Sequence, residues 1–185
     1  MRVVAGRLKG RVLAGPKSDG IRPTTDRMRE SLFNILAHGY DDIVQGARVL
    51  DLFAGTGALG IEALSRGAIF AAFADIGAEA RGLLRQNIET LGLGGVSRIL
   101  RRDATKLGPA TPFEPFTLIF LDPPYGKGLG EAALSAALVG GWLAKSALVV
   151  LEEHVKTKIT LPSGFGFVER REAGDTQFML AAVES

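Results

Sequence analysis

Apolar runs alternate with segments of helical periodicity through most of this chain. The runs predict buried strands at 49–53, 69–74, 97–100, 116–121 and 147–151. Apolar positions at helical spacing predict helices at 26–37, 58–65, 79–91 and 131–143. The first of these helices can be capped by Thr25 or Asp26, and its apolar face is expected to hold Met28, Leu32, Ile35 and Leu36. Such an alternation is typical of an α/β fold with a mostly parallel sheet covered on both faces.

The N-terminal segment departs from this alternation. Val3–Ala5 and Val12–Ala14 flank a glycine-bounded turn and predict a small β-hairpin, followed by a loop rich in proline and glycine. We therefore expect a basic N-terminal hairpin and arm over residues 1–24, and one compact unit over residues 25–185.

The C-terminal segment also departs from it. Residues 166–170 and 177–181 flank Gly174-Asp175, a turn dipeptide. This pattern predicts an antiparallel hairpin that closes the sheet.

The composition excludes several classes of protein and site. Of the 185 residues, 46% are hydrophobic and 23% charged, a balance typical of a globular domain. With no cysteine and two histidines, disulfides, thiolate metal sites and a cysteine nucleophile are excluded, and no metal is expected. The N-terminus predicts no leader peptide, and the most apolar stretch is interrupted by Gly140-Gly141 and Lys145. We expect a cytoplasmic protein without a membrane span, monomeric by default.

Charge is unevenly distributed along the chain. Residues 1–29 hold eight Lys or Arg and two Asp, whereas the remainder holds 14 basic and 18 acidic side chains. A basic arm on a mildly acidic body favours a polyanionic partner, although a solvated terminus gives the same pattern. The candidate contacts to such a partner are Arg2, Arg7, Lys9, Arg11, Arg22, Thr24 and Arg27.

A glycine loop follows the strand at 49–53. Gly55, Gly57 and Gly60 form a GxGxxG pattern, and Asp75 ends the next strand. Glycines allow a sharp turn and close approach of the backbone to a ligand, while a carboxylate after the second strand can accept both hydroxyls of a ribose. The loop therefore predicts a nucleoside-containing cofactor.

Three cofactor classes compete for this loop, beside a purely structural turn with a capping Asp. A phosphate-binding P-loop is excluded, because Gly60 is followed by Ile61-Glu62 rather than Lys-Ser/Thr. A dinucleotide fits the glycines, but Asp51 would then stand near a pyrophosphate. The same carboxylate suits the ammonium of S-adenosylmethionine, so this cofactor is favoured without excluding the dinucleotide.

A second motif, Asp122-Pro-Pro-Tyr125, follows the apolar run 116–121. It is expected at the carboxyl end of a central strand, where open α/β sheets place their chemistry. The Asp122 carboxylate and the Pro123 carbonyl can accept the two hydrogens of a base amino group, and Tyr125 can stack on the base. Orientation and electrostatics can then supply most of the rate of methyl transfer. Taken alone, the motif is equally compatible with a rigid turn.

The joint occurrence of the two motifs favours a methyltransferase that acts on an exocyclic amino group of a nucleic-acid base. The rivals are a dinucleotide-dependent oxidoreductase, which leaves Asp122–Tyr125 without a role, and an RNA-binding assembly factor without turnover. The motif also suits the amino group of adenine in DNA or RNA, so it does not by itself select guanine.

Two further polar groups lie at predicted strand ends. Asp103 can accept a hydrogen bond from an adenine amino group or simply cap a turn. His154, after Glu152-Glu153, is a candidate general base, but a lone histidine there is more typical of a surface position.

Together these residues resemble the RsmD-type family of 16S ribosomal RNA guanine-N2 methyltransferases. The resemblance covers nearly the whole chain and includes the glycine loop and the Asp122–Tyr125 motif, which many amino-methyltransferases share. Its more specific part is the block Arg22-Pro-Thr-Thr-Asp-Arg27. The sequence departs from the pattern after Asp75, and its tail from Arg171 matches only loosely.

The resemblance implies a class I methyltransferase fold, with a seven-stranded mostly parallel sheet, an antiparallel C-terminal hairpin and a small N-terminal hairpin. It implies S-adenosylmethionine as donor and a guanine of 16S rRNA, within a small-subunit particle, as acceptor. The implied cofactor-binding residues are Asp51, Phe53, Gly55, Gly57, Asp75 and Asp103. The implied catalytic residues, which would hold the base, are Asp122, Pro123 and Tyr125.

Overall fold

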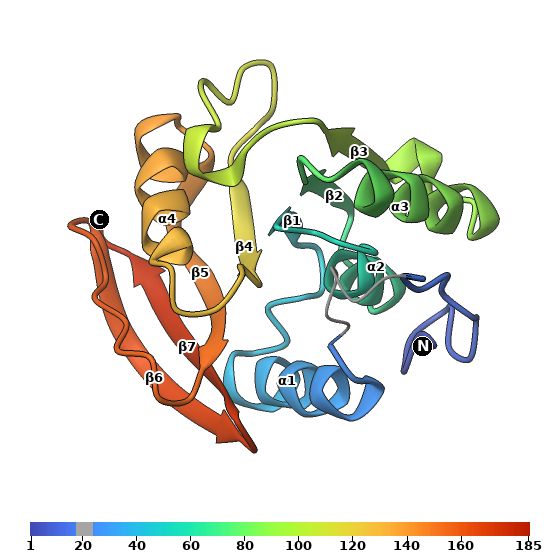
Figure 1. Ribbon diagram of the computed structural model, residues 1–185, viewed down its shortest axis with the longest axis horizontal. Coiled ribbons are helices and arrows are strands. Elements are labelled where there is room, and N and C mark those ends of the chain that lie inside the picture. Colours follow the sequence, from blue (N-terminus) through green and yellow to red (C-terminus); the bar gives the residue numbers. More distant parts are fainter. Residues whose placement is uncertain (18–23) are drawn as a thin grey trace.

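The computed structural model describes residues 1–17 and 24–185. Within this part of the chain, seven strands form one sheet in the order β3-β2-β1-β4-β5-β7-β6 (Figure 1). The strands are β1 Arg48–Leu52, β2 Phe70–Ala74, β3 Ser97–Leu100, β4 Phe116–Leu121, β5 Leu143–His154, β6 Phe165–Ala173 and β7 Thr176–Val183. Strands β1 to β5 are parallel, and β7 runs antiparallel to both β5 and β6. The predicted fold class and its C-terminal hairpin are confirmed.

Helices cover both faces of this sheet. They are α1 Asp26–Gly39, α2 Ala58–Ser65, α3 Ala78–Thr90 and α4 Leu129–Val139, with short 3₁₀ turns η1 Gly94–Val96 and η2 Ala104–Lys106. Alternate residues of each strand point to opposite faces, so Leu50 packs towards α4 and η2 whereas Val49 packs towards α1, α2 and α3. Figure 1 shows α4 on one side of the sheet and the other three helices across from it. In the described residues, no helix combines the length and the apolar content that crossing a bilayer needs.

The N-terminal hairpin is not confirmed. Residues 1–14 fold back on themselves, but their pairing is an isolated antiparallel bridge between Arg2 and Val12 rather than two strands. The backbone bonds from Val3 N to Arg11 O and from Gly10 N to Val3 O hold the turn together. Leu8 packs into the core beside α1 and α2. Packing against the sheet domain therefore replaces a longer ladder. The division proposed near residue 24 adjoins residues 18–23, which lie outside the described part, and stays a prediction.

Two element predictions need correction. The helix predicted at 131–143 begins at Leu129 and ends at Val139, because Gly140 caps it and Gly141 takes a φ of +76°. The chain then enters β5 at Leu143, earlier than predicted, and β5 continues to His154.

In α1 the buried residues are Arg29, Leu32, Phe33 and Leu36, so the buried face is rotated from the predicted one and includes an arginine. Thr25 rather than Asp26 is the cap, since its Oγ1 accepts from Met28 N.

Candidate active site

A cavity of about 850 Å³ opens at the carboxyl ends of the central strands. Its lining comes from the segments that follow β1, β2, β3 and β4, together with Thr24 and Leu129. Open α/β sheets bind ligands at this edge, and the volume is ordinary for a cofactor site. The cavity brings together these sequence-predicted residues: Thr24, Asp51, Phe53, Gly55, Asp75, Asp103, Asp122, Pro123 and Tyr125.

The glycine loop carries the chain from β1 into α2 through left-handed backbone conformations. Phe53, Gly55 and Gly57 have φ values of 58°, 57° and 82°. A non-glycine residue in this region is strained, and such strain clusters at functional sites. A Cβ on Gly57 would approach Leu84 Cδ1 to 2.3 Å, so glycine is required for packing against α3. Gly57 is absent from the cavity lining, and its role is to let the loop turn.

Asp51 lies at the bottom of this loop, with 1% of its surface exposed. Its Oδ2 accepts a hydrogen bond of 3.0 Å from Gly60 N, at the start of α2. Burial raises the pKa of Asp51 to about 8; the Gly60 N–H opposes this shift and the charge of Asp75 adds to it. A carboxylate in this setting gains from a cation nearby.

Asp75 braces two loops that border the cavity. Its Oδ2 accepts from Gly55 N at 2.9 Å, and its Oδ1 accepts from Gly77 N at 2.7 Å. Beside it, the side chain of Ile76 is largely exposed although it lines the cavity. A carboxylate next to an exposed apolar side chain offers both a hydrogen-bond acceptor and a flat contact.

Asp103 combines the two interpretations that the sequence left open. It caps η2, because Oδ1 accepts from Thr105 N at 2.9 Å and from Thr105 Oγ1 at 2.7 Å. The hydroxyl of Thr105 is the main reason that the pKa of Asp103 is lowered. Asp103 also lines the cavity. The turn cap is therefore observed, and contact with an adenine stays a prediction.

The loop Asp122–Tyr125 leaves β4 directly at the cavity. Asp122 N lies 3.4 Å from Leu52 O, which ties the start of the loop to the end of β1. Tyr125 donates its hydroxyl to Glu152 Oε1 at 2.7 Å and lies 3.2 Å from Thr176 Oγ1. The next residue, Gly126, donates its N–H to both carboxylate oxygens of Glu153. The loop is thus held by the carboxyl end of β5.

His154 lies close to Tyr125, but its side-chain hydrogen bond is to the backbone of Lys156. The two rings meet edge to face with centroids 6.0 Å apart. His154 Nδ1 accepts from Lys156 N at 3.2 Å, and the residue does not line the cavity. The position agrees with a structural role at the end of β5.

Thr24 lies inside the site rather than on its rim. It is 6% exposed, and its hydroxyl lies 3.3 Å from Asp122 Oδ2 and 3.5 Å from Glu152 Oε2. Its neighbour in the predicted set, Arg22, lies outside the described residues. The N-terminal arm therefore ends at the Asp122 carboxylate.

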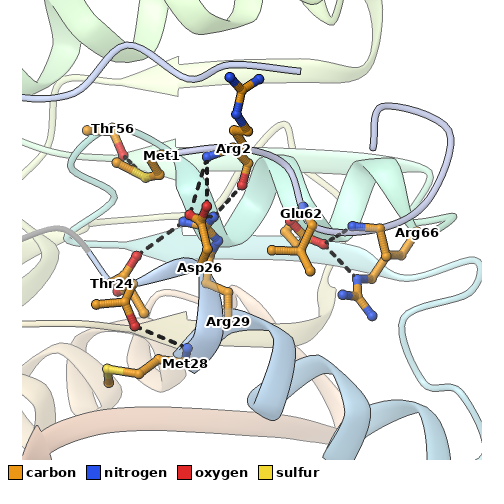
Figure 2. A network of polar contacts seen from close by, with 12 residues as sticks. Met1, Arg2, Thr24, Asp26, Met28, Arg29, Thr56, Glu62 and Arg66 are labelled. Carbon is orange, nitrogen blue, oxygen red and sulfur yellow. Dashed lines mark hydrogen bonds and ion pairs between the residues drawn. The ribbon is translucent and has the colours of Figure 1, made fainter. Parts of the chain in front are cut away.

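A polar network fixes the arm to the sheet domain (Figure 2). The guanidinium of Arg29, fully buried, donates to Arg2 O, Thr24 O and Asp26 Oδ1. Asp26 in turn accepts from Arg2 N. The bonds to Arg2 join the first residues of the chain to the start of α1, so Arg29 acts as a clamp.

Glu62 forms the second anchor of the arm. It is fully buried on α2, and its carboxylate accepts from Val4 N at 2.9 Å and from Ala5 N at 3.0 Å. Arg66 Nε completes the set at 2.8 Å. A buried carboxylate is tolerated only when it is hydrogen-bonded in this way.

Among the described residues, the basic side chains predicted to contact a polyanion lie outside the cavity. Arg2, Arg7, Lys9, Arg11 and Arg27 are exposed, and none lines the cavity. Arg2 and Arg11 reach backbone carbonyls, those of Gly10 and Thr90. The structure therefore places these positive charges outside the cavity, and Arg7 and Arg11 meet the C-terminal ends of α2 and α3, at Ser65 O and Thr90 O.

Sequence reasoning missed four buried charged residues: Arg29, Glu62, Glu152 and Glu153. Arg29 stands at i, i+3, i+4 and i+7 with Leu32, Phe33 and Leu36, a spacing that signals the buried face of α1. Glu152 follows an apolar strand directly, as Asp122 does, which was a detectable signal. The contacts of Glu62 with the arm gave none, because Ala5 and Val4 lie 57 and 58 residues away in sequence.

Comparison with known proteins identifies the family of this chain. A family model described as conserved hypothetical protein 95 matches residues 1–182. The chain belongs to this family. It is 37% identical over 181 residues to ribosomal RNA small subunit methyltransferase D of Escherichia coli strain K12, with 97% of this chain and 88% of the relative covered. The enzyme of the same name from Buchnera aphidicola subsp. Acyrthosiphon pisum is 32% identical, with 96% and 91% covered.

Solved structures agree with this family. The protein yhhF from Escherichia coli superposes with a TM-score of 0.84 and 34% identity, covering 100% of this chain and 98% of its own. The resemblance to the RsmD-type family is confirmed, and the chain is an enzyme of a methyltransferase family. The oxidoreductase alternative, which left the Asp122–Tyr125 loop without a role, is thereby dropped.

Proposed function

We propose that this enzyme transfers the methyl group of S-adenosylmethionine to the exocyclic N2 amino group of a guanine in 16S ribosomal RNA. The observation that carries the proposal is the shared cavity. The glycine loop, Asp75 and Asp103 line one part of it, and the Asp122–Tyr125 loop lines another. A cofactor and a base bound there would face each other within about 850 Å³.

The residues present fit S-adenosylmethionine. Asp51, buried and with a raised pKa, gains from the ammonium of the methionyl end. Asp75, at the end of β2, is placed to accept the ribose hydroxyls, and the exposed side chain of Ile76 offers an apolar surface to the adenine. Phe53 and Gly55 would border the methionyl end, and Asp103 would accept from the adenine amino group. When bound, the cofactor supplies an electrophilic methyl group on sulfur.

The Asp122–Tyr125 loop would hold the acceptor. A base amino group is a poor nucleophile because its lone pair is delocalised into the ring. The Asp122 carboxylate and the Pro123 carbonyl would accept its two hydrogens, and Tyr125 would stack on the base. On methylation the nitrogen would lose a proton, which the Asp122 carboxylate would accept and pass to solvent. Preorganised acceptors of this kind contribute about 10²–10³ to the rate.

The names of the relatives support ribosomal RNA of the small subunit as substrate. The exposed basic side chains of the arm, outside the cavity, suit phosphate contacts to RNA that extends past the target base. A paired guanine would have to leave its stack to reach Asp122, at about a few kcal/mol. We therefore favour an assembling small-subunit particle, with the enzyme as a monomer in the cytoplasm.

Transfer of a tritiated methyl group to 16S rRNA tests the proposal, with free RNA and assembling small subunits compared. Asp122→Ala should lower the rate about 100-fold or more, while Glu114→Ala, an exposed carboxylate at the opposite edge of the sheet, should leave it unchanged. Nucleoside analysis should find N2-methylguanosine. Label in methyladenosine would keep the mechanism and overturn the base, and RNA binding without any transfer would support the assembly-factor alternative.

A further inference from the structure

Glu152 lies at the carboxyl end of β5, beside the loop that would hold the base. Its side chain is 1% exposed, and its Oε1 accepts the Tyr125 hydroxyl at 2.7 Å. Burying a carboxylate is costly unless donors compensate for its lost water. The hydrogen bond from Tyr125 therefore stabilises the buried carboxylate, and it also holds the tyrosine side chain in place.

The register between β4 and β5 explains why Tyr125 meets Glu152. Leu151 on β5 pairs with Leu121 on β4, so Glu152 and Asp122 are the next residues on two adjacent parallel strands. The loop that begins at Asp122 returns over β5, which brings Tyr125 to Glu152. Glu152 itself is absent from the cavity lining, whereas Tyr125 and Asp122 line it. Any effect of Glu152 on a bound base must therefore pass through another residue.

Thr24 connects Glu152 with Asp122. Its hydroxyl lies 3.5 Å from Glu152 Oε2 and 3.3 Å from Asp122 Oδ2. A hydroxyl has one hydrogen, so it can donate to only one of the two carboxylates at a time. Thr24 therefore couples the two carboxylates, because its donation to one excludes donation to the other.

We propose that Glu152 is a positioning residue for methyl transfer, which orients the Tyr125 ring for stacking on the target base. The inference rests on the function proposed above. The chain offers a matched control, because its other tyrosine forms the same kind of pair: Tyr40 donates to Glu169 Oε1 at 2.5 Å, outside the cavity. Removing Glu169 breaks a tyrosine–glutamate bond without touching the site.

The test compares Glu152→Ala, Glu152→Gln, Tyr125→Phe, the double variant Glu152→Ala/Tyr125→Phe and the control Glu169→Ala. We expect Glu152→Ala and Tyr125→Phe each to lower kcat by about 10- to 100-fold, since misplaced reactants lose about this much. The double variant should be no more than about twofold worse than either single one, because both remove the same contact.

Glu152→Gln keeps an oxygen that accepts the Tyr125 hydroxyl, so it should recover most of kcat. The Kd for S-adenosylhomocysteine should stay within about twofold.

Multiplicative losses in the double variant would overturn the inference, because Glu152 would then act independently of Tyr125. The same holds if Glu152→Gln fails together with Glu152→Ala and both lose S-adenosylhomocysteine binding, the result of a purely structural role.

A measurement without catalysis separates this inference from the proposed function. The chain has two tyrosines, so ¹³C-tyrosine labelling gives two sets of ring signals, and Tyr125→Phe identifies one. The Tyr125 signals should shift in Glu152→Ala and return in Glu152→Gln, and unchanged signals would overturn the inference. Wild-type enzyme that binds S-adenosylhomocysteine but methylates no RNA would contradict the proposed function, while the spectra still decide whether Glu152 holds the ring.

Discussion

Asp51 lies near the end of β1 inside the protein, where burial raises its pKa from 3.8 to about 8. Between about pH 4 and pH 8, Asp51 is therefore protonated in the folded protein and ionised in the unfolded chain. Stability from this residue is largest near and below pH 4, falls as pH rises through that window, and levels off above pH 8. A ligand with a positive charge near Asp51 would reverse part of this loss.

Asp51→Asn should flatten the pH dependence of stability in the absence of cofactor. The amide keeps an oxygen for Gly60 N–H but has no charge to bury. Between pH 5.5 and pH 8.5, the melting temperature of the wild type should fall by several degrees more than that of the variant, since each kcal/mol is about 2–4 °C in a chain of this size. Thermal melts at the two pH values check this. An equal change of melting temperature in wild type and variant would show that burial does not raise the pKa of Asp51.

Gly60 and Gly82 are both helical glycines, but their surroundings differ. A Cβ on Gly60 would approach Phe73 Cε1 to 2.4 Å, whereas nothing lies within 4 Å of a Cβ on Gly82. Gly60→Ala should therefore destabilise the protein by about 1–3 kcal/mol through overpacking. Gly82→Ala in α3 should stabilise it by about 0.5–1 kcal/mol, because alanine is the better helix former. Urea unfolding checks both, and equal effects of the same sign would contradict the packing argument.

At the scale of elements, periodicity predicted the order of helices and strands well and their ends less well. The end of α4 was misplaced because Gly140-Gly141 stops the helix, while the neighbouring β4 gives residues from Leu143 a partner to pair with. The face of α1 was rotated because Arg29 is buried. The spacing of Arg29 with Leu32 and Phe33 marks this face, but only the structure shows the carbonyl partners, Arg2 O and Thr24 O, that make its burial tolerable.

Glu62 should determine whether the arm stays docked. Glu62→Ala removes the acceptor of Val4 N and Ala5 N and leaves Arg66 without this carboxylate. We expect a loss of about 3–5 kcal/mol, as for other broken buried charge pairs. Amide hydrogen exchange at Val4 and Ala5 should become faster, while exchange in β4 changes only with global stability. Ser135→Ala, on the exposed side of α4, is the control. Unchanged protection at Val4 and Ala5 would mean that other contacts hold the arm.

At the scale of the whole molecule, positive charge gathers on the arm and the rest of the chain is slightly acidic. The clamp of Arg29 and the anchor of Glu62 fix the segment that carries this charge to α1 and α2. An oriented basic surface favours association with RNA and sets its register over the site.

Lys9→Gln should reduce the salt dependence of RNA binding. If Lys9 contacts a phosphate, the slope of log Kd against log salt concentration should change by about 0.7–0.9. Lys145→Gln removes the same charge from the start of β5, at the edge opposite the cavity, and should leave the slope unchanged. Titrations of labelled rRNA at several salt concentrations measure both. The same slope change for both variants would indicate non-specific attraction.

The sequence by itself determined the kind of fold and the positions of the two motifs. Continuous apolar strands require cover on both faces, and the glycine loop and the Asp122–Tyr125 loop follow strands whose carboxyl ends share one edge. These are local patterns, which the order of residues records directly.

Only the tertiary structure decided what surrounds those motifs. Glu152 meets Tyr125, Thr24 meets Asp122 and Glu62 holds Val4 through contacts between segments 27 to 98 residues apart. Such contacts depend on strand register and on how loops return over the sheet, which no local pattern encodes. A buried charge is tolerated only where these distant partners converge, so the roles of Arg29, Glu62 and Glu152 emerge from the fold.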